Sequence, residues 1–310
     1  MIKKIIIVLF CLMLSSRIQA QQDPQYNLYQ FNQMIINPAY AGARDAIAVI
    51  ASHRNQWAGF DGAPKTSCLS AHSPFLNRKL GAGITIVSDK MGPRSLFGFY
   101  GNAAYILKIS NRFKLSFGLN AGYNRFQFDF KELTYKTTEQ SINFNQIQTY
   151  NKLDINTGFY LRSNTFFVGL SATHLAASDV YHFSTDTGNK SVSYRLRTHT
   201  FITIGNSFKI NENFIFAPTA MLKSGGGSAT GDLNLNFFLF KKLWLGVFGR
   251  GGYGPGFLLQ YYITNSFRVA YSFDSGGGER RVFGSSHEVM IGYDFAGSKN
   301  KSKVVSPRFL

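Results

Sequence analysis

The most regular hydrophobic pattern in the chain runs from Phe113 to Asn124, where apolar residues alternate strictly with polar or small ones. This period of two predicts a β-strand with one apolar and one polar face. Its length fits a strand that crosses a bilayer at a tilt, with lipid on one side and a polar lumen on the other. A soluble β-sandwich would show the same alternation, so the choice between these two folds depends on how the pattern recurs along the chain. The apolar face holds Leu115, Phe117, Leu119, Ala121 and Tyr123, and the other face holds Lys114, Ser116, Gly118, Asn120, Gly122 and Asn124.

Segments of this kind recur along the chain and predict fourteen strands, an even number as in bacterial outer-membrane barrels. The alternation is especially clear in Leu233/Leu235/Phe237/Leu239 and in Val289/Ile291/Tyr293/Phe295. The predicted strands are 46–56, 65–73, 80–88, 95–107, 113–124, 154–161, 165–172, 195–208, 213–221, 230–239, 242–250, 257–263, 265–273 and 285–295.

The connections between these strands alternate between short and long. Counted from the first predicted strand, the even-numbered gaps are short and the odd-numbered gaps are mostly longer and richer in glycine. Only the neighbouring gaps 74–79 and 89–94 are equal in length. A sandwich gives no reason for such sorting, whereas a barrel inserted from the periplasm has short periplasmic turns and long outer loops. The sequence therefore predicts an all-β fold, a transmembrane antiparallel β-barrel over residues 46–295, with both termini periplasmic. The long gaps are 57–64, 89–94, 125–153, 173–194, 222–229, 251–256 and 274–284.

The N-terminus resembles a secretory signal peptide. Lys3 and Lys4 precede an apolar run from Ile5 to Leu14, and Ala20 stands where cleavage is expected, so residues 1–20 are predicted to be removed. No later segment offers eighteen consecutive apolar residues, which excludes helical membrane insertion. Cleavage would leave Cys68 as the remaining cysteine, so no intramolecular disulfide is expected.

The two ends of the mature chain lack the strand pattern. Residues 21–45 are rich in amides and tyrosine, contain two prolines, and are predicted to be an irregular arm or short helix that enters the barrel mouth or lumen. Residues 296–310 are polar and basic, and we expect a periplasmic tail there.

Composition and charge agree with a barrel in the outer membrane of a Gram-negative bacterium. Aromatic residues make up 15% of the chain, and barrels place such residues at both water–lipid boundaries. The formal net charge of +17 falls to about +14 when the signal peptide is removed. Because export removes the chain from nucleic acid and no nucleic-acid-binding module is present, we expect Lys and Arg to face anionic outer-membrane lipid or lipopolysaccharide.

The sequence offers no recognisable catalytic or cofactor motif. The histidines form no pair at ligand spacing with a carboxylate or cysteine partner, so neither a metal site nor a cofactor is predicted. The glycine-rich stretches do not continue into a phosphate-binding loop, and no Gly-x-Ser-x-Gly motif occurs. The chain is therefore predicted not to be an enzyme. The histidines are at 53, 72, 174, 182, 199 and 287.

The two longest predicted loops, 125–153 and 173–194, carry aromatic residues among amides. Such loops suit recognition of a protein or a glycan. They also suit an inward fold that plugs the barrel, and the sequence leaves both interpretations open.

Several stretches resemble the PorP/SprF family of type IX secretion system outer-membrane proteins. The most specific are residues 26–42, YNLYQFNQMIINPAYAG, and 53–64, HRNQWAGFDGAP. Residues 70–75, 80–84 and 89–93 agree with the same family, as do 286–295 and 306–309. The resemblance covers nearly the whole mature chain.

The resemblance implies a partner of the type IX secretion and gliding motility machinery that exports or attaches a secreted cell-surface adhesin through its C-terminal sorting domain. It carries no catalytic residues. An alternative is an outer-membrane diffusion channel or uptake porin with an open polar lumen, and a third possibility is a structural anchor for periplasmic components. Turn or plug architecture is favoured over direct partner contact as the reason for the candidate partner-binding residues, which are Tyr29, Gln30, Phe31, Asn32, Asn37, Pro38, Trp57, Phe60, Asp61 and Pro64.

Overall fold

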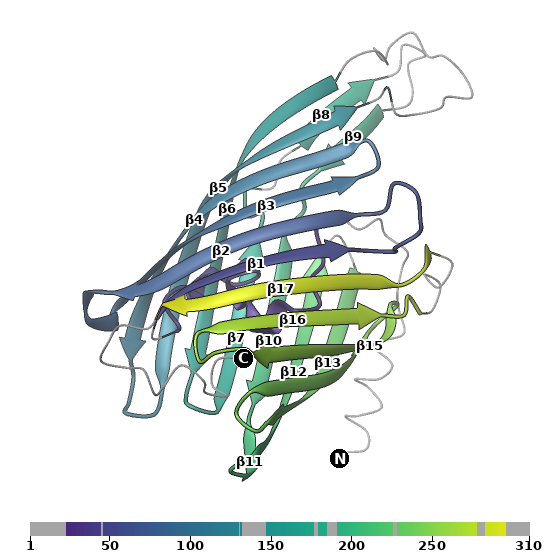
Figure 1. Cartoon of the computed structure of the whole chain (residues 1–310). Coiled ribbons are helices and arrows are strands. Elements are labelled where there is room, and N and C mark those ends of the chain that lie inside the picture. Colours follow the sequence, from purple (N-terminus) through teal and green to yellow (C-terminus); the bar gives the residue numbers. More distant parts are fainter. Residues whose placement is uncertain are drawn as a thin grey trace, which may run out of the picture.

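A computed structural model of the chain describes residues 23–44, 46–129, 131, 147–176, 179–184, 191–225, 228–277 and 283–295. Antiparallel strands form one sheet that closes into a barrel (Figure 1). The first and last strands pair, and β10 pairs with β12, so the described strands complete a ring of fourteen. The ring consists of β1 (Ile47–Asn55), β2 (Lys65–Phe75), β3 (Leu80–Met91), β4 (Arg94–Lys108), β5 (Lys114–Asp129), β6 (Ile147–Arg162), β7 (Phe166–Thr173), β10 (His199–Asn206), β12 (Phe214–Gly225), β13 (Ser228–Leu239), β14 (Leu243–Arg250), β15 (Gly254–Tyr262), β16 (Phe267–Asp274) and β17 (Ser286–Phe295).

Fold class and strand number agree with the sequence prediction, but several strand and loop boundaries do not. The strand expected at 195–208 starts at His199 and is continued by β11 (Phe208–Asn211), which pairs with β12. The expected loop 173–194 contains a hairpin of β8 (Asp179–Ser184) and β9 (Ser191–Arg195).

A third boundary error concerns the expected loop 125–153. Both ends of that segment, 125–129 and 147–153, are strand, because β5 and β6 are each 16 residues long and pair over their full length. Beyond Asn124 the inward positions become apolar, and Phe126 and Phe128 pack against Tyr194 inside the barrel wall. The prediction failed because apolar residues there face inward, opposite to the membrane-spanning part.

The connections lie at two ends of the barrel, which we call the short-turn end and the long-loop end. Each connection at the short-turn end is brief, and one of them holds η4 (Leu76–Arg78). The long-loop end carries 56–64, 130–146, 174–198 and 275–285. The gaps expected at 89–94, 222–229 and 251–256 are shorter than predicted, because the flanking strands extend to within two or three residues of each other.

The outer surface of the barrel is apolar, as the alternation along 113–124 predicts. In β5, Leu119 is 56% exposed and Ser116 is fully buried. The same outward arrangement recurs on other strands, for example Ile84, Phe97, Ile202, Leu233, Val247 and Ile291. An apolar band of this kind matches lipid around a barrel. Among the described residues, no helix is long and apolar enough to cross a bilayer.

The interior is filled by residues 23–44, which we call the N-terminal segment (purple in Figure 1). It folds into three short 3-10 turns, η1 (Tyr29–Phe31), η2 (Gln33–Ile35) and η3 (Pro38–Tyr40). Most of its apolar side chains form one core with inward-facing barrel residues such as Tyr160, Trp244 and Leu258. Tyr29 and Ile36 pack in a second cluster with Phe201 and Met221. Phe238, an inward position, is part of that core.

The N-terminal segment runs from one end of the barrel to the other. Asp23 contacts His174 and His199 at the long-loop end, whereas Arg44 contacts Asp294 at the short-turn end, just before β1 begins. Since β17 also ends at the short-turn end, the two described ends of the chain lie at opposite ends of the barrel. The prediction that both termini are periplasmic concerns residues before 23 and after 295, which lie outside the described part.

Two inward glycines give the N-terminal segment the room that it needs. A methyl group on Gly118 would lie 2.1 Å from the backbone nitrogen of Ala39, and one on Gly81 would lie 2.0 Å from the carbonyl oxygen of Ala41. Larger residues at these positions on β5 and β3 would therefore exclude the segment from its place against the wall.

Candidate functional site

The N-terminal segment is held by polar groups that the barrel presents inward. The side-chain oxygen Oε1 of Gln30 accepts from Asn236 at 2.9 Å and from the Thr219 hydroxyl at 3.2 Å. The Asn37 side chain accepts from the Ala39 N–H at 3.0 Å and donates to the carbonyl of Phe159 at 3.0 Å. The polar lumen face that the sequence pattern predicts thus binds the chain itself.

Charged side chains bind the segment at both of its ends. Asp294 on β17 accepts from Arg44 at 2.7 Å and from Arg268 at 2.5 Å, and all three residues are at most 2% exposed. Nearer the long-loop end, the Asn27 backbone N–H donates to Glu288 at 2.6 Å, and the Asn27 side chain donates to Asp274 at 2.9 Å. Buried ions of this kind are costly unless paired, so these contacts fix the segment in one register.

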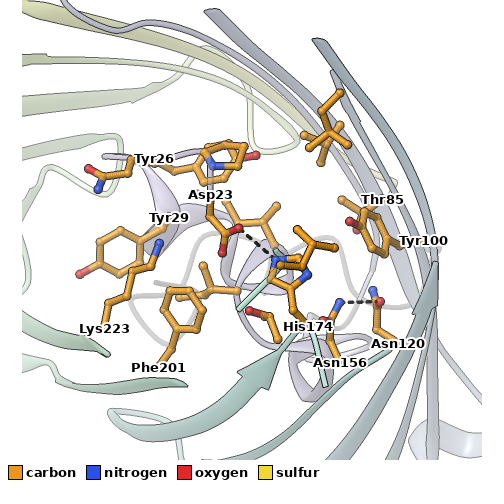
Figure 2. Close-up of a pocket in the computed structure, with 18 of the residues that line it drawn as sticks. Asp23, Tyr26, Tyr29, Thr85, Tyr100, Asn120, Asn156, His174, Phe201 and Lys223 are labelled. Atoms are coloured by element: carbon orange, nitrogen blue, oxygen red, sulfur yellow. Dashed lines mark hydrogen bonds and ion pairs between the residues drawn. The ribbon is translucent and has the colours of Figure 1, made fainter. Parts of the chain in front are cut away.

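A cavity of about 130 Å³ lies between the N-terminal segment and the wall toward the long-loop end. Its lining combines aromatic and amide side chains with a few charged ones, and Figure 2 shows them pointing into a common space. The lining includes Asp23, Tyr26, Tyr29, Tyr100, Asn120, Asn156, His174, Phe201 and Lys223.

One edge of this cavity carries an acid–histidine cluster made of Asp23, Asp154, His174 and His199. The two oxygens of Asp23 lie 3.0 Å from Nε2 of His174 and 3.0 Å from Nδ1 of His199. Nδ1 of His174 lies 2.7 Å from Asp154 of β6. Burial alone would lower the pKa of His174, but the carboxylates of Asp23 and Asp154 outweigh it and raise this pKa to about 10. Burial would raise the pKa of Asp23, yet the two histidines hold it well below its usual value.

A row of inward amides positions His174. The His174 backbone N–H donates to Asn156 at 2.7 Å, Asn156 donates to Asn120 at 2.9 Å, and Asn120 donates to Asn102 at 2.8 Å. His174 itself has a φ of 56°, which is uncommon for a residue other than glycine. The row therefore holds its backbone in a conformation that the residue alone would disfavour.

The six candidate residues of the segment all lie inside the barrel. Tyr29 accepts from Asn234, Phe31 packs against Trp244, and Asn32 accepts from Ser70. Gln30 and Asn37 are buried as well, and all five of these side chains are at most 3% exposed. Pro38, the sixth, is buried within η3. No partner can reach these side chains while the segment stays in place.

The four candidate residues of the first long loop lie elsewhere, at the rim of the long-loop end. Phe60 is 48% exposed and Asp61 is exposed, whereas Pro64 is buried. Trp57 has a φ of 53° and packs its ring 4.9 Å from Phe283, and Phe60 meets Phe283 at 5.1 Å. The structure thus divides the predicted set into a buried group and a rim group.

The argument from histidine spacing missed the acid–histidine cluster. Asp23 comes from the N-terminal segment, His174 follows β7, and His199 begins β10, so barrel closure and segment docking together assemble the cluster. The spacing of these residues along the sequence therefore gives no sign of the site.

The closed ring, its apolar outer surface and its inward polar side chains define an outer-membrane β-barrel protein. The chain belongs to the family described as type IX secretion system membrane protein PorP/SprF, which matches residues 18–293. This confirms the resemblance found in the sequence. No curated protein matches the chain.

Solved structures similar to this chain include channels and outer-membrane proteins. A deltaS2S3 mutant of TodX, a monoaromatic hydrocarbon channel, has a TM-score of 0.50 and 10% identity, with 88% of this chain and 95% of that chain covered. The Acinetobacter baumannii outer membrane protein Omp33 has a TM-score of 0.47 and 13% identity, covering 82% of this chain and 100% of that one. At such identity the likeness concerns the fold alone.

Proposed function

We propose that this protein is a non-enzymatic barrel of the type IX secretion and gliding machinery that helps to export or attach a secreted adhesin at the cell surface. The long-loop end faces outward and contacts the C-terminal sorting domain of the adhesin. The short-turn end and the basic tail 296–310 face the periplasm, where other secretion components bind, and outer-membrane lipid or lipopolysaccharide surrounds the wall.

The observation that carries this proposal is the filled lumen. Residues 23–44 occupy the interior from Asp23 to Arg44 and are held by hydrogen bonds and buried ion pairs. A plugged barrel is poorly suited to free diffusion of a solute, and this favours protein contact over the alternative of a diffusion channel or uptake porin. The exposed aromatic ring of Phe60 at the rim suits such contact, since aromatic residues are enriched in protein interfaces.

The test is a gentle-detergent pull-down of the tagged protein from its native envelope, with partners identified by mass spectrometry. We expect a large secreted protein to be recovered through its C-terminal domain, and Phe60→Ala with Asp61→Ala to reduce that recovery. Phe240→Ala is the matched control, because Phe240 is 68% exposed at the short-turn end. Equal loss with the control variant would refute rim contact.

Conductance distinguishes the alternative. In a planar bilayer the purified barrel should show no steady open current, because the segment fills the lumen. A stable conductance combined with an empty pull-down would favour the channel.

A further inference from the structure

We propose that Asp23, His174 and His199 form a zinc site that fastens the beginning of the N-terminal segment to the barrel wall. This inference does not depend on the proposed function. It concerns the edge of the cavity at the long-loop end, where the three side chains converge from separate parts of the chain (Figure 2 labels two of them).

The first argument is geometric. One ligand atom from each of the three residues can be chosen so that all lie within 4.8 Å of one another. Zinc–nitrogen and zinc–oxygen bonds of about 2.1 Å place tetrahedral ligands about 3.4 Å apart. Asp23 already lies 3.0 Å from each imidazole, through a different oxygen in each case. To hold an ion, one Asp23 oxygen and the two imidazoles must move closer together from separations of up to 4.8 Å.

The second argument is the support around His174. A histidine that binds a metal through one ring nitrogen usually donates the other N–H to a carboxylate, which fixes its tautomer and orientation. Asp154 lies 2.7 Å from Nδ1 of His174 and is 1% exposed, which leaves Nε2 directed at Asp23. The row of amides ending at Asn156 also holds the unusual backbone of His174. Strained backbone held in this way is frequent at functional sites.

The third argument is the choice of ion. Two imidazoles and one carboxylate suit zinc, whereas magnesium and calcium prefer oxygen ligands alone. A bound dication would displace the proton of His174, and the carboxylates of Asp23 and Asp154 would then balance its two charges. Lys223 and Arg250 line the same cavity, but Arg250 is paired with Asp232, and the Lys223 ammonium lies 5.4 Å from the centre of the Phe201 ring. Three protein ligands leave a fourth position for water.

A site of this kind would stabilise the plugged state. Asp23 is the first described residue of the segment, while His174 and His199 stand at the ends of neighbouring strands β7 and β10. An ion shared among them would join the segment to the wall more firmly than the present contacts of Asp23 with the two imidazoles.

The experiment measures zinc binding by the full mature chain in detergent, purified without a histidine tag and stripped with a chelator. Isothermal titration with zinc chloride should give one site per chain, and Co²⁺ substituted for zinc should show the visible absorption of a tetrahedral complex. His199→Gln and Asp23→Asn should abolish the site, and Asp154→Asn should weaken it by about 10–100-fold. His53→Ala is the matched control, because His53 lies outside the cavity and bonds to Ser67.

Two outcomes would overturn the proposal. Absence of saturable binding to the folded wild-type barrel would leave the cluster as a network of ion pairs. Binding that His199→Gln leaves unchanged would place the ion elsewhere on the chain. Each variant is first checked for heat-modifiable mobility in electrophoresis, so that loss of binding is compared only among folded barrels. Asp154→Asn keeps every proposed ligand and so tests the site even if another variant fails to fold.

Discussion

Gly118 offers the sharpest test of how the N-terminal segment is held. In Gly118→Ala, the new methyl group would lie 2.1 Å from the nitrogen and 2.4 Å from the Cα of Ala39, whereas ordinary contact begins at 3.4 Å. The two backbones must therefore separate by about 1.3 Å. η3 packs against β4, β5 and β6 and cannot move alone.

Overpacking of this kind costs about 1–3 kcal/mol. The obstacle here is backbone rather than a flexible side chain, so we expect about 2–3 kcal/mol against the docked segment. At about 1.4 kcal/mol per factor of ten, the undocked population should rise about 30-fold to 140-fold.

Limited trypsin digestion reports this population. Arg44 is 2% exposed, and no Lys or Arg lies between Gln21 and Arg44, so cleavage after Arg44 releases residues 21–44 as one peptide. Gly101→Ala is the matched control, since its methyl group would meet only the carbonyl oxygen of Ala121, at 3.9 Å. Release at the wild-type rate in Gly118→Ala would refute the close packing described here.

Three further predictions concern the lumen contacts and the lipid face. Asp294→Asn removes the carboxylate that pairs with both Arg44 and Arg268. Because these charges are buried, the free energy of unfolding measured by urea titration should fall by about 3–5 kcal/mol. The control Glu212→Gln, at an exposed position of the short-turn end, should change it little. Asn37→Ala removes the hydrogen bonds to Ala39 and Phe159 and should destabilise the docked segment by about 1–2 kcal/mol. Trypsin should then release residues 21–44 faster. Asn211→Ala, in an exposed turn, is the control. Leu119→Arg places a charge in the apolar band and should cost about 2–4 kcal/mol in vesicles, whereas Ile147→Arg at the outer end of β6 should cost about 1 kcal/mol or less. Equal costs for the last pair would contradict the position of the band.

The sequence predicted the wall of the barrel better than its contents. Alternation along β5 identified which side chains face lipid, because one period of two decides both faces at once. The extension of β5 past Tyr123 was missed because the alternation continues there with apolar side chains, those of Phe126 and Phe128, facing inward. Only the position of the β8–β9 hairpin and of Tyr194 explains why apolar groups turn inward there.

The contents of the lumen depend on contacts that local patterns do not encode. The amides of Gln30 and Asn37 can be recognised as polar, but their partners Asn236 and Phe159 are far away along the chain. The cluster of Asp23, His174 and His199 likewise exists only after the ring closes. Such sites depend on how all the strands of the barrel are aligned with one another, which local sequence patterns do not determine.

The path of the N-terminal segment also constrains the order of assembly. The segment contacts Glu288 and Asp294 on β17, the strand that closes the ring by pairing with β1. A chain that closed this seam first would have to thread twenty-two residues through a finished ring. Biogenesis is therefore simplest if residues 23–44 are already docked when β17 arrives, so that the segment serves as an internal template and barrel closure selects for chains that carry it in place.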